Sequence, residues 1–341
     1  MLKNELQSPF RGRARLVLLF TSLLLLLTAV TACSNGEQQK TGTDAESSSQ
    51  VPAVLNYGYI GTSKLNYPGG AEGWGFYKGI IQAELKAYGI QEIQLTAFPN
   101  GPDLSESLIS GRLNIGSLGD TPAILSRSTG AKTKVITQPS THSIGYLIGR
   151  KDGPTTLADL SGKTISTQKG SFHHRFLAGL LKENNITDVK IVHMLIADAE
   201  PALARGEIDA MTTTDKFAYN QIQQGYPLIA DATTHENLLG TGVTVVTEDY
   251  LGQFAEIPKA WNAAREKALK DLQAHPEEYY AFLAELYNVS IDVAKELYPI
   301  SEIKDTAFTD AGIELMNGTK QFLVDEGLAA ADFDLNDWII R

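Results

Sequence analysis

The chain has 341 residues with 29 basic and 40 acidic side chains, and its net charge is −11. A protein this acidic is a poor partner for nucleic acid or for the surface of an anionic bilayer. Its single cysteine excludes an internal disulfide, so the fold must depend on a hydrophobic core, and the length suits one large or two modest domains.

The N-terminus has the pattern of a lipoprotein signal. Three arginines precede the apolar run 16–29, which is too short for a membrane-spanning helix and is typical of a signal-peptide core. Small residues then lead into Cys33, where a lipobox would receive a diacylglycerol. We therefore expect a signal peptide over residues 1–32 and lipidation of Cys33, which would anchor the protein on the extracytoplasmic side of the cell membrane. The alternative is an ordinary secretory signal with an incidental cysteine.

The segment after the signal is polar and carries no apolar periodicity. We expect residues 33–51 to be a flexible tether between the lipid and the folded part.

Strands and helices alternate along the folded part. The expected strands are 54–60, 93–98, 113–118, 135–138, 163–167, 189–194, 208–212 and 242–246. The expected helices are 76–88, 104–110, one opened by Thr121, 172–182, one capped by Asp198 and ended by Gly206, 258–273, 276–287 and 309–326. The alternation favours an α/β fold with mostly parallel sheets, and the helical tail is expected to cover the first lobe.

An internal repeat indicates two similar lobes. Four residues of the first unit (Gly111, Leu113, Asn114 and Asp120) have the same spacing as four of the second (Gly206, Ile208, Asp209 and Asp215). We expect one lobe to comprise residues 52–145 and 243–341 and the other to comprise residues 146–242, with hinges near 145–150 and 240–245.

Two such lobes would meet at the carboxyl ends of their strands, where open α/β sheets bind ligands. Thr121 and Ser171 are expected to cap helices there, and helix N-termini bind anions without needing a lysine. The cleft is also expected to include Trp74, because the glycines around it keep it off a regular core face. The predicted ligand-binding residues are Gly61, Thr62, Ser63, Trp74, Asp120, Thr121, Gly170, Ser171, Phe172, His173 and Asp215.

Two local patterns suggest a metal site or a catalytic site, but neither has the arrangement of residues that such a site needs. Adjacent histidines at 173 and 174 point about 100° apart on a helix and have no cysteine nearby, so we expect no metal site. Ser171 followed by His173 lacks the nucleophile elbow of a hydrolase. We expect no catalytic residue and no cofactor, while Lys169 and Arg175 are expected in solvent.

Four segments carry a resemblance to a known family. They read FPNGPDLSESLISGRLNIGSLGDTPAI, LADLSGKTISTQKGS, IADAEPALARGEIDA and HPEEYYAFLAELYNVS. In this order they resemble the substrate-binding proteins of ABC importers for aliphatic sulfonates, taurine, nitrate and related compounds, and the Gly-Asp-Thr-Pro segment is closest to the sulfonate branch. The resemblance implies a two-lobed periplasmic-binding-protein fold of type II, a monomer that holds a small anionic solute between its lobes and docks onto the permease subunits.

The resemblance leaves the solute open. It implies an aliphatic sulfonate first, and taurine, nitrate, a sulfate ester or a thiamine precursor as alternatives. The family often has Trp-Asp-Pro where this chain has Thr214-Asp215-Lys216, so the aromatic residue at that point is missing. Enzymes of pyrimidine synthesis share the fold but carry a cysteine-rich motif that one cysteine cannot supply. A solute-sensing lipoprotein is the alternative of a different class.

Overall fold

The computed structural model describes residues 51–61, 63 and 65–341. The predicted signal peptide, Cys33, most of the predicted tether and Thr62 lie outside the described residues.

Two five-stranded mixed sheets form the centres of two lobes. The first sheet has the order β2-β1-β3-β10-β4 and the second has the order β7-β6-β8-β5-β9. The strands of the first are β1 (Val54–Ile60), β2 (Glu92–Phe98), β3 (Ile115–Gly119), β4 (Thr133–Ser143) and β10 (Gly240–Thr247); those of the second are β5 (Gly145–Gly149), β6 (Thr164–Thr167), β7 (Lys190–His193), β8 (Ala210–Thr214) and β9 (Leu228–Asp231). The two-lobed α/β architecture predicted from the sequence is confirmed.

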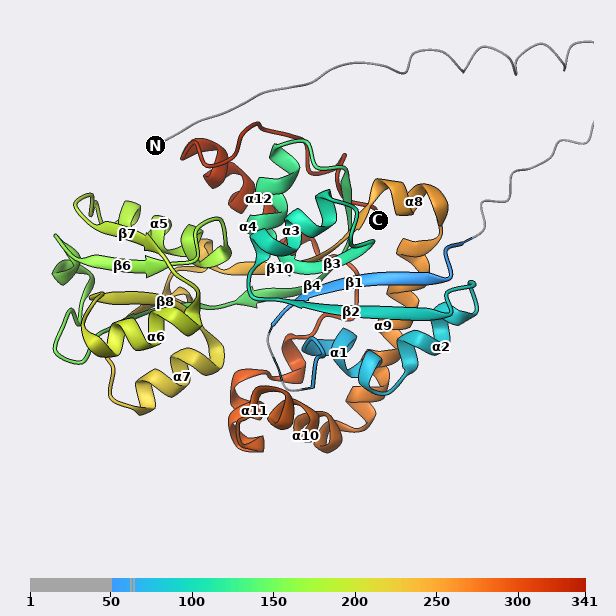
Figure 1. Cartoon of the computed structure of the whole chain (residues 1–341), viewed down its shortest axis with the longest axis horizontal. Helices are drawn as coiled ribbons and strands as arrows, with labels where there is room; N and C mark the ends of the chain where they lie inside the picture. The colour runs from blue at the N-terminus through green and yellow to red at the C-terminus, as the bar shows by residue number, and fades with distance from the viewer. Residues whose placement is uncertain (1–50, 62, 64) are drawn as a thin grey trace, which may run out of the picture. The chain divides into compact units, whose positions relative to one another are not determined.

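The sheets are less parallel than predicted. In each sheet three strands pair in parallel, namely β2-β1-β3 and β7-β6-β8. The other two strands of each sheet, β10 and β4 in the first and β5 and β9 in the second, pair antiparallel. After β4 the chain passes from the first lobe to the second, and β10 belongs to the first lobe again after the chain returns (Figure 1).

The helices follow the strands and pack beside them. They are α1 (Gly70–Tyr77), α2 (Ile80–Lys86), α3 (Gly101–Ile109), α4 (Asp120–Ser128), α5 (Phe172–Glu183), α6 (Ile196–Arg205), α7 (Asp215–Gln223), α8 (Glu248–Gln253), α9 (Ile257–Ala274), α10 (Pro276–Tyr287), α11 (Ile291–Leu297) and α12 (Asp310–Asp325), with short 3₁₀ turns η1 (Leu157–Leu160), η2 (Ala232–Thr234), η3 (Glu236–Leu238) and η4 (Ile300–Glu302). Of the tail helices, α9 packs on α1 and α2 and α12 packs on α4 and β10, so the tail covers the first lobe as predicted.

Several helix boundaries differ from the prediction, those of α1, α2 and α6 among them. The helix predicted over residues 76–88 is two helices, because Gly79 takes a left-handed φ of 74° and separates α1 from α2. The next difference is at α6, whose N-cap is Leu195 and not Asp198, so Asp198 lies inside the first turn. A carboxylate there still favours the positive end of the helix dipole.

The internal repeat is a repeat of structure. Gly111 and Gly206 both take left-handed φ values, 72° and 74°. The strand after each glycine leads directly into a helix, so α4 begins at Asp120 and α7 begins at Asp215. The two aspartates therefore occupy equivalent positions at the carboxyl ends of equivalent strands.

Asn114 and Asp209, the polar residues that precede β3 and β8, play the same role in the two lobes. Asn114 Oδ1 accepts a hydrogen bond from the backbone N–H of Asn56, at 2.8 Å. Asp209 Oδ2 accepts from the N–H of Thr164, at 2.9 Å. Each side chain thus binds the neighbouring parallel strand and fixes the register of the pair.

Arg175 of α5 is buried in the second lobe, although the sequence led us to expect it in solvent. Its guanidinium group donates to the carbonyl oxygens of Asn237, Leu238 and Leu239, at 3.2, 3.1 and 2.6 Å. These carbonyls precede β10, so one side chain holds the segment that leads back to the first lobe.

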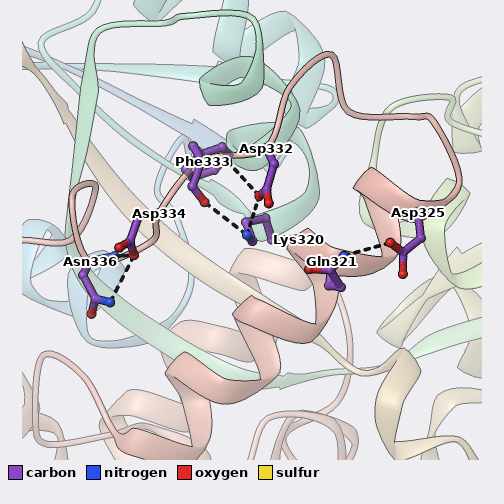
Figure 2. A network of polar contacts seen from close by, with 7 residues as sticks. All are labelled: Lys320, Gln321, Asp325, Asp332, Phe333, Asp334 and Asn336. Atoms are coloured by element: carbon purple, nitrogen blue, oxygen red, sulfur yellow. Dashed lines mark hydrogen bonds and ion pairs between the residues drawn. The ribbon is translucent and has the colours of Figure 1, made fainter.

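The C-terminal residues are tied to α12 through Lys320, as Figure 2 shows. The Lys320 ammonium group pairs with Asp332 at 2.5 Å and donates to the carbonyl oxygen of Phe333 at 3.1 Å. Further along, Trp338 is fully buried and Ile339 bridges to Val135 beside the first sheet. The end of the chain thereby completes the core of the first lobe.

Among the described residues, no helix is both long enough and apolar enough to cross a membrane.

Candidate functional site

A cleft lies between the two lobes. It consists of three adjoining cavities of about 460, 370 and 320 Å³, and all three are lined by Gly69, Asp215 and Tyr287. Volumes of this size are typical of sites for small molecules. The residues that follow β1, β3, β6 and β8 line it, so the cleft is at the carboxyl ends of the parallel strands, where such folds bind ligands.

The cleft is rich in tyrosine and poor in positive charge. Its tyrosines are Tyr57, Tyr59, Tyr67, Tyr146, Tyr279, Tyr287 and Tyr298. Among the residues that line it, Lys216 is the one lysine or arginine, and its ammonium group donates to the carbonyl oxygen of Tyr287 at 3.3 Å. An anion in this cleft would therefore be held mostly by backbone N–H groups and hydroxyls.

The N-terminus of α1 supplies such N–H groups. Its N-cap residue, Gly69, offers no side chain, and no hydrogen bond accepts from the N–H groups of Ala71 and Glu72 among the described residues. These residues also line the largest cavity. Free N–H groups at the positive end of a helix dipole favour an anion.

The Glu72 side chain in this first turn is fixed by an ion pair with another helix. Glu72 forms a buried ion pair with Arg265 of α9, with Oε1 and Nε 3.1 Å apart. The pair neutralises the carboxylate and fixes α1 against α9.

Trp74 does not line the cleft, which corrects the expectation from the sequence. It is fully buried among the tail helices, its ring lies edge-on to Tyr279 and Phe282, and its Nε1 donates to Asp271 Oδ1 at 2.7 Å. The glycines around it begin α1, and the helix then turns the indole toward the tail helices.

Asp120 and Thr121 do not face the cleft either. Both are buried, and neither lines any of the three cavities. The N-cap of α4 is Gly119, so the prediction that Thr121 caps this helix is wrong. The Asp120 carboxylate instead accepts from the N–H and hydroxyl of Thr121, from those of Thr241 and from the hydroxyl of Thr319. Because Asp120 occupies the first turn, its own charge already satisfies the positive end of α4.

Ser171 caps α5 as predicted and lines the cleft. Its Oγ accepts from the N–H of His173 at 3.2 Å and donates to the carbonyl oxygen of Gln168 at 2.6 Å. The Ser171 hydroxyl proton is thus committed to a carbonyl, and the hydroxyl is not arranged to transfer that proton to His173. The neighbouring Phe172 lines the same cavity, and its ring lies beside Gly240 at the start of β10.

Gly170 forms the turn before this cap but is not among the cleft-lining residues. Its left-handed φ of 81° and its position 3.3 Å (from an ideal Cβ) from Pro102 explain why glycine is needed there. The turn brings the second lobe against the first.

Gly61 and Ser63 line the smallest cavity, while Thr62 lies outside the described residues. Ser63 Oγ is buried and has no hydrogen-bond partner among the described residues. The same holds for the hydroxyl of Tyr59, a residue that lines the adjoining cavity and whose pKa is raised to about 12, first by its burial. Both hydroxyls are free to bind a solute.

His173 and Asp215 line the same two cavities. Burial lowers the pKa of His173 to about 4, so its ring is neutral at ordinary pH. Burial raises the pKa of Asp215 to about 6, and a hydrogen bond from Thr214 offsets part of that effect. Among the described residues, no ion pair includes Asp215. The second lobe therefore presents a carboxylate and a neutral imidazole to the cavity.

The sequence reasoning did not identify Gly69, Tyr287 or Tyr298, which come from the loop before α1 and from the tail. The two tyrosine rings stack with centroids 4.4 Å apart, and burial raises both of their pKa values. The run YNVS, which begins at the last residue of α10, gave no local signal of a binding role. Only the packing of the tail against the second lobe brings these rings to the cleft.

The cleft and the fold agree with a family assignment. The sequence pattern described as NMT1/THI5-like matches residues 86–279, which is more than half of the chain. The chain belongs to the NMT1/THI5-like family. The matched range of this NMT1/THI5-like chain contains both units of the internal repeat and the first turns of α5 and α7.

Relatives and solved structures agree with the predicted resemblance. A protein of Escherichia coli (strain K12) named as a binder of aliphatic sulfonates is 29% identical over 179 residues, covering 49% of this NMT1/THI5-like chain and 56% of the relative. The match thus spans little more than half of that relative's length. The alkanesulfonate-binding protein SsuA of Xanthomonas axonopodis pv. citri, solved with MOPS bound, has a TM-score of 0.70 at 20% identity, covering 85% of this chain and 99% of SsuA.

The same fold is also used by an enzyme. The desulfurization enzyme DSZB has a TM-score of 0.65 at 16% identity, covering 84% of this chain and 96% of DSZB. The NMT1/THI5-like fold alone therefore does not separate a binding protein from an enzyme, and the side chains of the cleft must decide. Among the described residues, no group of three or more His, Cys, Asp or Glu side chains is placed to hold a metal ion.

Proposed function

We propose that this chain is the solute-binding protein of an ABC importer, and that it binds a small organic anion, an aliphatic sulfonate in the first instance, between its two lobes. The observation that carries the proposal is the uncapped N-terminus of α1 in the interlobe cleft. Its free N–H groups would hold the negative charge, beside the Ser117 hydroxyl, which contacts the hydroxyls of Tyr57 and Thr244, each at 2.7 Å. The name of the E. coli relative points to the same solute class.

Binding without catalysis is the reading that the cleft favours. The one serine beside a histidine there, Ser171, uses its proton on the Gln168 carbonyl. The chain is therefore proposed to deliver its solute unchanged to the permease subunits, with residues 52–145 and 243–341 as one lobe and 146–242 as the other. We propose that it works as a monomer held at the membrane by lipid on Cys33.

The solute class can be tested by thermal unfolding of the purified protein with alkanesulfonates of increasing chain length. Taurine, nitrate, sulfate esters and thiamine precursors serve as competing classes. A ligand at 100 times its dissociation constant adds about 2.7 kcal/mol to the free energy of unfolding. We expect a rise in melting temperature with sulfonates, and a rise with another class alone would reassign the solute.

A sensor is the second candidate, because a solute-sensing lipoprotein would need the same cleft. Reconstitution with a candidate permease separates the two functions. Transport of the solute that depends on this protein supports import, whereas tight binding with no transport would favour sensing.

A further inference from the structure

Glu72 is the third residue of α1, beside the N–H groups that would hold the negative charge of the solute. It is buried, with 4% of its surface exposed, and it lines the largest cavity together with Tyr57 and Tyr279. Its Oε2 lies 3.8 Å from the position of an ideal Cβ on Gly70, the first residue of the helix. A carboxylate is therefore turned back over the same helix end that offers donors to an anion.

Arg265 holds Glu72 in its charged form. Arg265 of α9 is also buried, and its Nε lies 3.1 Å from Glu72 Oε1. The Arg265 Nη2 is buried and has no hydrogen-bond partner among the described residues. Because a buried guanidinium group without a charged partner strongly destabilises a fold, the packing of α1 on α9 requires a carboxylate at Glu72.

The ion pair presents its negative end to the solute. Glu72 lines the largest cavity, whereas Arg265 lines none of the three cavities of the cleft. Burial raises the pKa of Tyr57 and that of Tyr279 well above the usual range, and the negative charge of Glu72 raises both further. The charge of this carboxylate is therefore felt by the groups that line the cavity, although the pair as a whole is neutral.

A second negative charge on the solute would meet no positive group that balances it. The N-terminus of a helix is equivalent to only about half of an elementary positive charge. Lys216, the one lysine or arginine among the described residues that line the cleft, does not line the largest cavity. The other acidic residues of this cavity, which are less buried than Glu72, add negative charge: Asp215, Glu296 and Glu302.

We infer that Glu72 is a specificity-determining residue that admits a head group with one negative charge and excludes a head group with two. This inference rests on the proposed function and adds a rule of charge to it. Sulfonates and sulfate esters, which carry one charge, satisfy the rule, whereas phosphate esters in their dianionic form and inorganic sulfate do not. The physical cause is that like charges brought together without a counter-ion oppose binding.

Butyl sulfate and butyl phosphate test this rule, because they have nearly the same shape and differ in charge. Butyl sulfate carries one negative charge at pH 5 and at pH 7.5, whereas an alkyl phosphate gains its second charge near pH 6, a value that is roughly general for such esters. At pH 7.5 we expect calorimetry to give a dissociation constant roughly tenfold to a hundredfold larger for the phosphate. At pH 5 the two constants should agree within about threefold.

Variants assign the effect to Glu72, because Asp215 also loses a proton between pH 5 and pH 7.5. Glu72→Gln keeps the size of the side chain and should abolish or reverse the discrimination at pH 7.5. The double variant Glu72→Gln/Arg265→Gln leaves no buried guanidinium group unpaired, so it guards against a single variant that does not fold, and it should also lose the discrimination.

A control variant separates the position of Glu72 from the total charge of the cleft. Glu302 lines the same cavity, but it is exposed and pairs only weakly with Lys304, at 3.9 Å. Solvent and salt screen an exposed charge more than a buried one. Glu302→Gln removes one negative charge, as Glu72→Gln does, and should keep the discrimination.

The outcomes separate the inference from the proposed function. Equal affinity for the two esters at pH 7.5, or a discrimination as large at pH 5 as at pH 7.5, overturns the inference and leaves the sulfonate-binding function standing. A discrimination that persists in the folded double variant overturns it too, because another group must then exclude the second charge. If neither butanesulfonate nor butyl sulfate binds at millimolar concentration, the proposed function fails, and the inference fails with it.

Discussion

The hydroxyl of Tyr287 lies against Gly69, in the place where any other residue would carry its β-carbon. An ideal Cβ built on Gly69 would be closer than 3.0 Å to this oxygen and 3.3 Å from the Tyr287 Cζ. The tail helix α10 and the N-cap of α1 therefore touch at one point of the cleft, and the tyrosine sets how far the N–H groups of α1 can project.

The first prediction is that Gly69→Ala destabilises the protein and weakens solute binding. The backbone of Gly69, with φ of −85°, suits alanine, so the cost should come from the clash with Tyr287 alone. Overpacking of this kind costs roughly 1–3 kcal/mol. Chemical denaturation and calorimetry measure the two effects.

Tyr287→Phe provides the matched control for this prediction. Removing the hydroxyl leaves only the 3.3 Å approach to Cζ, so Gly69→Ala should cost less in the Tyr287→Phe background. We expect a coupling of about 1 kcal/mol or more in the double-mutant cycle. Additive effects would mean that the two residues do not constrain each other.

The second prediction concerns the free energy of unfolding of the protein without added solute. Because the pKa of Asp215 is raised to about 6, the native state keeps a proton that the unfolded chain loses near pH 4, and stability falls as the pH rises between these values. Asp215→Asn should therefore match the wild type near pH 4 and exceed it at pH 7.5, by up to about 3 kcal/mol.

Denaturation at pH 4, 6 and 7.5 measures this difference. The lowered pKa of His173, about 4, adds an opposite slope to both proteins, so only the difference between them isolates Asp215. A variant less stable than the wild type at pH 7.5 would mean that the carboxylate is structural, like Asp120.

The third prediction is that Asp120→Asn destabilises the protein without a direct effect on binding. The amide loses one acceptor oxygen and turns an N–H₂ group toward the threonine donors, at a cost of roughly 2–4 kcal/mol. Thr319→Val, which removes one of the donors, should cost about 1 kcal/mol. Solute affinity measured below the melting temperature should change less than about threefold, and loss of binding in a folded Asp120→Asn protein would restore Asp120 as a ligand residue.

The fourth prediction concerns membrane attachment, which depends on the unpaired Cys33 after small residues. Cys33→Ser should abolish acyl labelling and move the protein from the membrane fraction to the soluble one. A variant that keeps both its label and its location would refute the lipoprotein proposal. The same variant should bind the solute normally, since the cleft is built from residues beyond position 51.

Local signals predicted the scaffold of the cleft well. Glycines at 111 and 206 end helices in a left-handed conformation, and Ser171 caps α5, so the sequence identifies the strand ends and helix starts without knowledge of distant contacts. These are short-range effects of backbone conformation and capping.

Long-range contacts decided the rest. The sequence assigns Asp120 and Asp215 the same position, and only Thr241 and Thr319, 121 and 199 residues from Asp120, make one of them structural. Trp74 was misplaced for the same reason, because its partners lie in the tail. Tyr287 reaches the cleft from the end of α10. The sequence of α10 predicts only an amphipathic helix and does not mark Tyr287 as a cleft residue. The remaining predicted ligand contacts stay predictions.

The segment that leads from the second lobe back to the first is held by hydrogen bonds from both lobes. Arg175, in the second lobe, holds the carbonyls of residues 237–239, and Asp120, in the first, holds Thr241. Gly240 is the one residue between these two groups of hydrogen bonds. An ideal Cβ built on Gly240 would lie 2.6 Å from the Phe172 ring. Gly240 is therefore the one residue of this returning connection that neither group of hydrogen bonds holds, and a relative rotation of the lobes would change its backbone angles first. Phe172 also lines the cleft, so a bound solute would lie next to the segment that joins the two lobes.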